Sequence, residues 1–186
     1  MKLSRELNKQ FIITDLGELK CYLGINVRRN KAGDFLVSQR KYINKIIENA
    51  RLTEAKGSNM PMDPGYMKMR DMTPNIFNTT YQKLIGSLLY LSVNTKPDIT
   101  APVAILSQHI KDTKQQDWNE IQRIIRYLKN TSEYELLLSD STATDKQLLG
   151  YADVNWAESR TDRKSNSRYL FKFMGGTISW SCKEQD

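Results

Sequence analysis

The chain has 186 residues, of which 39% are hydrophobic, and its 28 Lys and Arg exceed its 21 Asp and Glu by a net charge of +7. This length is enough for one ordinary domain with a buried core, and the aromatic content argues against wholesale disorder. Because the basic residues are interspersed with acids, the charge suggests only weak affinity for a polyanion.

Single residue types exclude several classes of protein. Cys21 and Cys182 lie at opposite ends of the chain, which excludes a disulfide framework and a zinc knuckle. The one histidine, His109, cannot anchor a His-rich metal site, and we interpret it as a helix-end residue whose partial positive charge suits the helix dipole. The longest apolar stretch, residues 84–93, is too short to cross a membrane, and the N-terminal residues lack the apolar segment of a secretory signal. We therefore expect an intracellular protein, cytoplasmic or nuclear and not secreted, without membrane contact.

The chain is predicted to open with a short helix and an extended strand. Residues 1–10 form the helix, with Ser4 as its cap, and a turn cluster follows at residues 15–17. Apolar and polar residues then alternate over residues 19–28, which is typical of a half-buried strand.

A hairpin and a second helix follow this strand. Residues 30–33 have turn composition and residues 35–37 form a returning strand, so the two strands are expected to pair antiparallel. Ser38 is the predicted cap of the next helix. The apolar face of that helix consists of Ile43, Ile46, Ile47 and Ala50.

Residues 54–80 show neither the helical nor the strand period, and they contain several Pro and Gly residues and five of the seven methionines. This length is too great for a tight connection, so we expect a wrapped or partly mobile linker. One hypothesis is that the methionines bind copper or a protein partner. The alternative is that they fill irregular gaps in the packing, which flexible thioethers more often do.

Three amphipathic helices are predicted between residues 81 and 130, because apolar residues recur there with helical spacing. Lys96-Pro97-Asp98 ends the first helix and caps the second, and Thr113 with Gln116 resembles a capping box for the third. Burial must supply most of their stability, since each is short. The apolar positions are Tyr81, Leu84, Ile85, Leu88 and Leu89, then Ile99, Val103, Leu106 and Ile110, then Trp118, Ile121, Ile125 and Leu128.

The end of the chain predicts an antiparallel meander of three strands, at residues 148–156, 168–173 and 177–181. A boundary near residues 139–146 divides the chain into units 1–139 and 140–186. The predicted class is α+β, with a β-hairpin, a helical middle and an incomplete antiparallel sheet.

Asp153 is the first candidate functional residue, because the chain contains no phosphate loop, metalloprotease motif or nucleophile elbow. It lies between Tyr151 and Trp156 in an otherwise apolar strand. A carboxylate in such a strand must be solvated, paired or bound to a cation. The alternative is a strand-end or hydrogen-bonded aspartate without a functional role.

The second candidate is a basic set, Arg123, Arg126 and Lys129, on the third of the central helices. Its steps of three residues drift around the helix, which gives a broad basic flank and not a tight row. The flank is either a phosphate-binding surface or a solvated helix face.

A series of motifs, in this order, resembles the Pol polyprotein of copia-type retrotransposons. Together they cover essentially the whole chain, which makes the resemblance specific. The motifs are Asp15-Leu16-Gly17-Glu18, Tyr22-Leu23-Gly24-Ile25, Pro61-Met62-Asp63-Pro64-Gly65-Tyr66, residues 81–91, Lys96-Pro97-Asp98-Ile99, Arg126-Tyr127-Leu128-Lys129, Gly150-Tyr151-Ala152-Asp153, Asp162-Arg163-Lys164-Ser165 and Gly176-Thr177-Ile178-Ser179-Trp180.

The resemblance implies that residues 18–37 are the last hairpin of a reverse-transcriptase palm, where such polymerases hold the primer strand. Residues 38–130 would be thumb and connection helices, and residues 140–186 the opening strands of an RNase H domain. The basic flank would then lie along an RNA–DNA or DNA duplex and position its backbone without reading its sequence. Because the elements that cover the family's sheet lie downstream, we expect the apolar faces of Leu170, Phe171, Ile178 and Trp180 to be under-covered.

The resemblance also implies that Asp153 is the first metal-binding aspartate of the RNase H site, which uses Mg²⁺ in the intact family enzyme. The family's polymerase carboxylates precede residue 1, and the glutamate that partners Asp153 follows residue 186. Two-metal catalysis needs a carboxylate cluster, so we expect Asp153 alone to bind no metal and this fragment to have no cofactor. Two residues depart from the family pattern: Asn155 stands in place of a second Asp, and Arg168 in place of a Gly.

We therefore expect a fragment of a copia-type reverse transcriptase/RNase H polyprotein that is catalytically inactive alone. Its expected partners are a nucleic-acid duplex, bound weakly and without sequence preference, and the remaining parts of the polyprotein. The alternative is a host-recruited nucleic-acid-binding or protein-interaction module without catalysis, and a third reading is a subunit completed by another chain.

Overall fold

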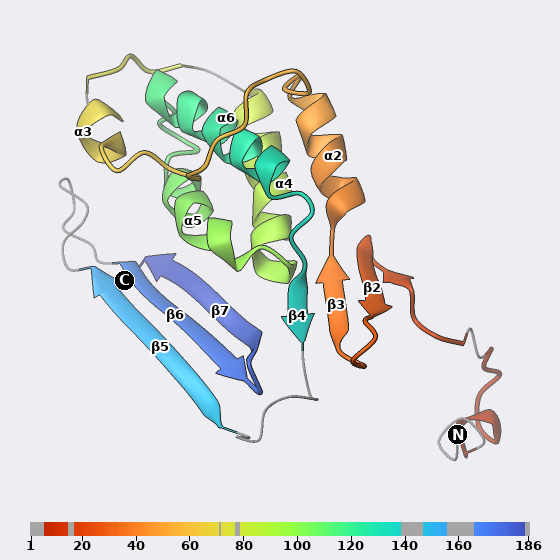
Figure 1. Ribbon diagram of the computed structural model, residues 1–186. Coiled ribbons are helices and arrows are strands. Elements are labelled where there is room, and N and C mark those ends of the chain that lie inside the picture. The colour runs from red at the N-terminus through yellow and green to blue at the C-terminus, as the bar shows by residue number, and fades with distance from the viewer. Residues whose placement is uncertain are drawn as a thin grey trace.

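The computed structural model describes residues 6–14, 17–70, 72–76, 79–138, 147–155 and 166–184. They form an α+β fold with two antiparallel sheets and a helical layer, which confirms the predicted class (Figure 1). In chain order the elements are β1 (Cys21–Tyr22), β2 (Ile25–Arg29), β3 (Phe35–Ser38), α2 (Arg40–Asn49), α3 (Tyr66–Arg70), α4 (Thr79–Asn94), the 3-10 helix η1 (Pro97–Ile99), α5 (Thr100–Gln108), α6 (Gln115–Asn130), β4 (Leu136–Leu138), β5 (Leu148–Asn155), β6 (Asn166–Phe173) and β7 (Gly176–Glu184).

Residues 19–28 are not the single strand that their alternation predicts. They contain β1 and β2, which pair antiparallel with Cys21 opposite Asn26. The turn between them consists of Leu23 and Gly24, whose φ angles are 48° and 76°. Two consecutive residues with positive φ form the turn that best matches the twist of paired strands. The alternation continues on both arms of this turn, so the pattern could not show where the chain reverses.

The predicted hairpin is confirmed, and a later strand extends it. β2 and β3 pair antiparallel with Val27 opposite Val37, and β4 pairs with the other edge of β3, with Leu137 opposite Leu36. The first sheet therefore has the order β1-β2-β3-β4. Because β4 follows α6, the helical layer is inserted between two neighbouring strands of one sheet.

The helices predicted between residues 38 and 130 are confirmed, but two of their caps are wrong. Of the first predicted helix, residues 6–8 are helical and residues 9–10 form a turn. Ser38 ends β3, and the residue before α2 is Gln39, which accepts a hydrogen bond from the Thr95 hydroxyl at 2.8 Å. Helix α6 starts one residue later than the predicted capping box, because the Asp117 carboxylate accepts the Lys114 backbone N–H at 2.7 Å. The predicted Ser4 cap and the turn at residues 15–16 lie outside the described residues.

The core lies between the helices. Most of the predicted apolar positions are buried in it, which confirms the helical periods. The buried hydrophobic residues are Ile43, Ile46, Ile47, Tyr66, Tyr81, Leu84, Ile85, Leu88, Leu91, Ile99, Val103, Ile105, Leu106, Ile121, Ile124, Ile125 and Leu128. Among the residues that the structure describes, no helix has the length and apolar character to cross a membrane.

The second sheet is the predicted meander, with the order β5-β6-β7. It lies beside α5, and β7 runs next to β4 (Figure 1). The Trp180 indole N–H donates to the Ser92 carbonyl oxygen of α4 at 2.6 Å, so the predicted under-coverage is wrong for Trp180. It is confirmed for Phe171 and Ile178, which are exposed. The predicted boundary at residues 139–146 lies outside the described residues.

We expect Trp180→Phe to lower the free energy of unfolding by about 1 kcal/mol, because it removes the hydrogen bond that attaches β7 to α4. Among the described residues, the Ser92 carbonyl would keep the longer bond from the Thr100 hydroxyl, at 3.3 Å. Urea denaturation followed by circular dichroism measures the loss. Tyr169→Phe, on the exposed face of the same sheet, is the matched control and should change the value by less than about 0.5 kcal/mol. Equal effects of the two substitutions would contradict the attachment.

Candidate functional site

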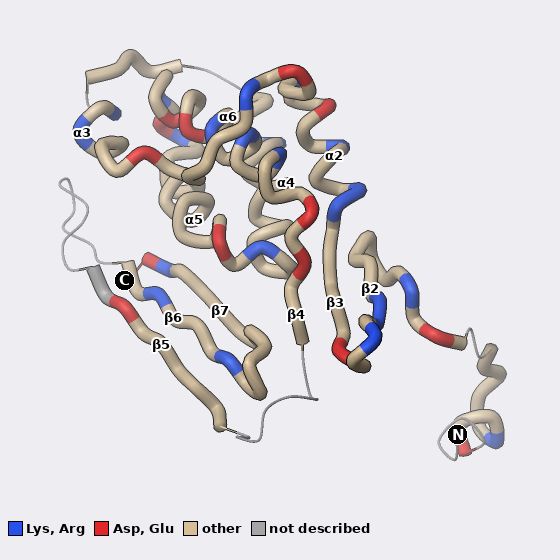
Figure 2. Tube along the Cα trace, viewed as in Figure 1, with Lys and Arg blue, Asp and Glu red and all other residues tan. Residues whose placement is uncertain are grey.

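The basic flank on α6 contacts another part of the chain. Figure 2 shows that the segment after α2 runs alongside α6. Arg123 Nη2 lies 3.0 Å from Asp63 Oδ2, and Arg123 Nε lies 3.2 Å from Glu120 Oε2. Lys129 Nζ donates to the Ala55 carbonyl oxygen at 2.9 Å and also to that of Thr53. Two of the three predicted phosphate-binding residues therefore have internal partners.

These partners belong to residues 53–70, which we call the wrapped segment. The Ser58 N–H donates to the Arg126 carbonyl oxygen at 3.2 Å, and Asn130 Nδ2 donates to the Ser58 carbonyl oxygen at 3.1 Å. Gly57 approaches α6 so closely that a Cβ atom there would lie 1.7 Å from Asn130 Oδ1. The wrapped conformation predicted for this part of the chain is confirmed.

Arg126 is half-buried, and its Nε is buried without a hydrogen-bond partner among the described residues. Unlike Arg123, Arg126 forms no ion pair with an acid among the described residues. Binding of nucleic acid by Arg123, Arg126 and Lys129 stays a prediction, and the geometry shows that two of them also hold the fold together.

A buried acid–base cluster anchors the wrapped segment to the start of α6. Asp117 is fully buried, and its Oδ1 accepts the Tyr66 hydroxyl at 2.6 Å and Arg70 Nε at 2.9 Å. Arg70 Nη2 also donates to the Asp112 carbonyl oxygen at 2.6 Å. Burial opposes the charge of Arg70, but the charge of Asp117 and the hydrogen bonds outweigh it, so the pKa of Arg70 is raised. Burial and the bond to Asp117 raise the pKa of Tyr66, which therefore remains a donor.

Sequence reasoning missed this cluster, because its members lie far apart in the chain and follow no period. His109, at the C-terminal cap of α5, lies beside it with its ring centroid 6.4 Å from that of Tyr66. Burial and the charge of Arg70 lower the pKa of His109. The expected helix-end position is confirmed, but the expected positive charge is disfavoured by these surroundings.

An accessible basic surface lies around β2, with Lys20 just before β1, Arg29 at the end of β2 and Lys31 in the turn to β3. Lys20, Arg29 and Lys31 are exposed, and the Arg29 guanidinium lies 4.5 Å from the centroid of the Phe35 ring. Lys20, Arg29 and Phe35 line a groove of about 470 Å³. Figure 2 shows basic positions concentrated on β2 and the following turn. Arg and aromatic side chains that share a groove are suited to phosphate and base contacts.

Asp153 lies directly opposite Arg168 in the β5–β6 pairing. Arg168 Nη1 is 3.9 Å from Asp153 Oδ2, and the Asp153 side chain is 65% exposed. The two residues border a pocket of about 240 Å³, whose opposite wall includes Pro97, Thr100 and Ala101. Asp153 is therefore a solvated carboxylate beside a cation, one of the environments expected from its place in an apolar strand.

These residues do not fit a magnesium centre. Mg²⁺ in a two-ion site needs several oxygen ligands and a surplus of negative charge. The described residues contain no group of three acidic, histidine or cysteine side chains that could hold a metal ion. The Arg168 guanidinium also places a positive charge beside the one carboxylate. The side chain of Asn155 lies outside the described residues.

Comparison with known proteins gives several matches. A model described as reverse transcriptase (RNA-dependent DNA polymerase) matches residues 1–64. The chain is 34% identical to the retrovirus-related Pol polyprotein from transposon TNT 1-94 of Nicotiana tabacum, over 99% of this chain and 14% of that protein. It is 32% identical to the Pol polyprotein from transposon RE1 of Arabidopsis thaliana, over 96% of this chain and 12% of that protein. It is 40% identical to secreted RxLR effector protein 161 of Plasmopara viticola, over 58% of this chain and 75% of that protein. No solved structure gives a significant match.

We expect Asp117→Asn to lower the free energy of unfolding by about 3 kcal/mol, because it removes the buried charge partner of Arg70 and leaves only the exposed Asp112 carboxylate beside it. Asp112→Asn is the matched control, since it removes a carboxylate that also lies close to Arg70 but is 57% exposed. An exposed ion pair contributes little, so this control should cost less than about 1 kcal/mol. Both values come from chemical denaturation. Similar losses for the two variants would show that Asp117 is not the anchor.

Proposed function

Because the chain belongs to the retrovirus-related Pol polyproteins of copia-type retrotransposons, we propose that it is a non-catalytic, nucleic-acid-binding part of such a polyprotein. The chain spans about one seventh of the Pol polyproteins it matches, at 14% and 12% of their length. We therefore propose an activity for this chain alone and none for the whole polyprotein.

The proposed arrangement assigns residues 1–139 to the end of the palm and to thumb or connection helices, and residues 140–186 to an RNase H-like sheet. Two observations support it. The hairpin formed by β2 and β3 lies inside the region matched by the reverse-transcriptase model. The three-stranded meander carries Asp153 on its first strand, where the resemblance puts the first RNase H aspartate.

The proposal that this chain is not catalytic rests on the Asp153–Arg168 pair. Hydrolysis by two ions requires both to be bound together between carboxylates and the substrate phosphate. Here the residue opposite Asp153 is a cation whose Nη1 lies 3.9 Å from the carboxylate. Arg168 thus reduces the negative potential that would attract Mg²⁺, and we propose no step through a bound metal.

The basic surface around β2 is the proposed contact with the nucleic-acid backbone. Lys20, Arg29 and Lys31 are exposed, whereas Arg123 and Lys129 bind the wrapped segment. Contacts to phosphates position a duplex without reading its sequence. Binding should therefore be weak, sensitive to salt and independent of nucleic-acid sequence. Of the three basic residues on α6, only Arg126 would add a phosphate contact, because Arg123 and Lys129 bind the wrapped segment.

A recruited interaction module is a second candidate function. It is supported by the similarity to secreted RxLR effector protein 161, three quarters of which is covered by 58% of this chain. Such a module would bind a protein partner with no dependence on the basic residues around β2. The salt dependence of duplex binding distinguishes the two functions.

We expect no cleavage of an RNA–DNA hybrid in Mg²⁺ or Mn²⁺, because the Asp153–Arg168 pair does not form a two-ion site. A gel-based assay measures cleavage, and thermal unfolding with and without each ion measures metal binding. Neither ion should shift the unfolding temperature of the wild-type chain or of Asp153→Asn. Metal-dependent cleavage that Asp153→Asn abolishes would contradict the non-catalytic assignment.

We expect the logarithm of the duplex binding constant to fall with the logarithm of salt concentration with a slope near −3, for about three phosphate contacts. The triple substitution Lys20→Gln, Arg29→Gln and Lys31→Gln should bring the slope close to zero. The matched control, Lys68→Gln, Lys111→Gln and Lys183→Gln, removes the same charge from exposed positions elsewhere and should keep it. Fluorescence anisotropy measures both.

Two results would contradict this site around β2. Equal flattening of the slope in the control would show that only net charge matters. Flattening in a triple Gln variant of Arg123, Arg126 and Lys129, at unchanged unfolding free energy, would place the contacts on α6.

A further inference from the structure

His109 is the one histidine of the chain, and it lies beside the cluster that joins α3 to α6. It is the C-terminal cap of α5, and its ring centroid is 6.4 Å from that of Tyr66 on α3. Its Nε2 atom is buried and has no hydrogen-bond partner among the described residues. The imidazole is therefore a titratable group at the place where the wrapped segment is anchored.

Protonation of this ring has to place a hydrogen on the buried Nε2 atom. A neutral imidazole carries one N–H group, whereas both nitrogens of the charged form are donors. The Nε2 atom has no acceptor within the described parts of the chain, and a buried charged donor without an acceptor is costly. The neutral ring avoids this cost when Nδ1 carries its single proton. The surroundings of Nε2 thus favour the neutral form.

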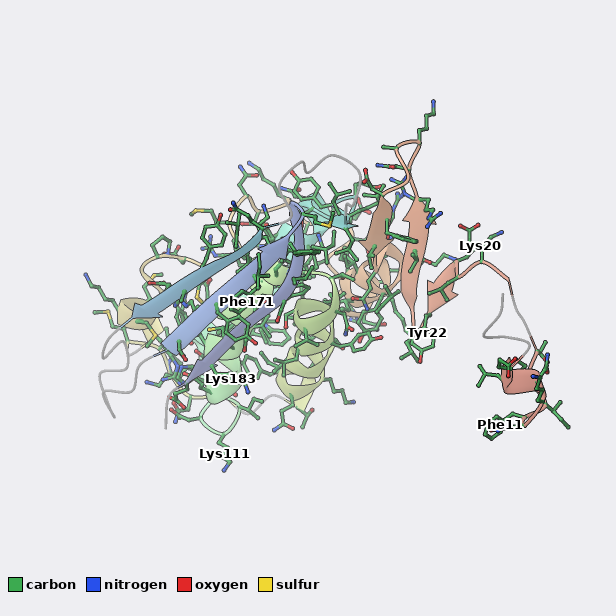
Figure 3. All side chains as sticks on the ribbon, turned by 90° about the horizontal axis from the view of Figure 1, so that it is seen from below. Phe11, Lys20, Tyr22, Lys111, Phe171 and Lys183 are labelled. Atoms are coloured by element: carbon green, nitrogen blue, oxygen red, sulfur yellow. The ribbon has the colours of Figure 1, made fainter. Side chains whose placement is uncertain are left out.

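The charged groups that face the ring come from α3, from α6 and from the connection before α6. They are two cations and two acids, namely Arg70, Lys114, Asp112 and Asp117. Burial and the charge of Arg70 outweigh the two acids, so the pKa of His109 is lowered from its ordinary value of 6.5. Lys111, two residues after His109, points away from the body of the molecule (Figure 3).

Helix α3 supplies both the ring and the main opposing charge beside His109. It has five residues, which is too short for a helix that is stable alone. Its two buried side chains, Tyr66 and Arg70, both donate to Asp117. When α3 leaves α6, the imidazole loses the neighbouring Tyr66 ring and the Arg70 cation together. The open form of this region therefore accepts a proton more readily than the closed form.

We propose that His109 makes the attachment of α3, and of the wrapped segment that ends with it, weaken on acidification through the uptake of one proton. The open form titrates near the ordinary pKa of 6.5, and the closed form titrates lower. Below pH 6.5 the open form holds more protons, so the closed form loses stability as the pH falls, until its own lower pKa is reached. The ratio of open to closed form grows by at most tenfold per pH unit, which gives up to about thirtyfold at pH 5.

This opening acts on the covered face of α6. Asp63, the partner of Arg123, lies three residues before α3. A phosphate ligand of Arg123 that binds only when α3 has opened gains the same factor in apparent affinity, because more of the chain is then competent to bind. This consequence rests on the proposed nucleic-acid binding, whereas the opening itself does not.

Proton NMR of the full chain measures the pKa of the imidazole directly, because no second histidine contributes a signal. We expect the pKa of His109 to lie below 6.5 in the folded wild-type chain. A value of 6.5 or above would overturn the proposal, because protonation would then not oppose the closed form. This measurement needs no substitution.

Hydrogen exchange of the full chain at pH 7 and pH 5 tests whether α3 responds to this proton. The amides to follow are those of Asp63, which donates to Glu120, and of Met69, which donates to Gly65. The protection factor, which is the intrinsic exchange rate divided by the measured rate at each pH, removes the direct effect of pH on exchange. In wild type it should fall by up to about thirtyfold at both positions.

His109→Gln is the matched variant, because its side chain does not titrate, and circular dichroism at pH 7 verifies that it folds. Its protection factors at Asp63 and Met69 should stay constant over this range. The amide of Asn30, which donates to Asp34 in the turn between β2 and β3, is the internal control and should keep its protection in both chains. Constant protection at Asp63 and Met69 in wild type, an equal fall in His109→Gln, or an equal fall at Asn30 would each overturn the proposal.

Discussion

The buried Asp117 carboxylate is the constraint on which the arrangement of the helices depends. It accepts hydrogen bonds from the Tyr66 hydroxyl, from Arg70 and from the Lys114 backbone N–H. An ionised carboxylate without such partners would be too costly to bury. The start of α6 and helix α3 must therefore stay together, and the part of the wrapped segment before α3 lies along α6, where Ser58 contacts Arg126 and Asn130.

This constraint changes what the basic face of α6 does. An amphipathic helix with a basic polar side can bind an anionic ligand or hold an acidic part of its own chain. In this protein Arg123 lies between Asp63 and Glu120, and Lys129 caps carbonyl oxygens of the wrapped segment. The same choice recurs in the second sheet, where Arg168 lies opposite Asp153. At both places an internal ion pair occupies the site where resemblance to the polyproteins suggests an external ligand.

Periodic sequence patterns predicted those parts of the fold in which a residue is buried because of its position on one helix or strand. Ile43, Ile46 and Ile47 are buried as the helical period requires, and the meander forms as its alternation predicts. The reversal at Leu23 and Gly24 was missed, because a turn with positive φ leaves the alternation intact on both sides. The side-chain partners of Asp117, Tyr66 and Arg70, are about 50 residues away, and their contact depends on tertiary packing that no local pattern reveals. Asp153 and Arg168 were both identified in the sequence as unusual, but their contact depends on the register of β5 and β6, which only the structure shows.

Hydrogen exchange of the wrapped segment, with and without a nucleic-acid duplex, tests the central claim most directly, namely that this segment is a fixed part of the fold that covers the basic face of α6. The amides to follow are those of Ser58, Asp63 and Tyr66, which donate to Arg126, Glu120 and Asp63 respectively. The account predicts slow exchange at all three positions and no change on adding duplex, because Arg123 and Lys129 remain bound to the segment. Exchange at the rate of an unstructured peptide, or loss of protection when the duplex binds, would show that the segment is displaced and that the basic face of α6 is the nucleic-acid site.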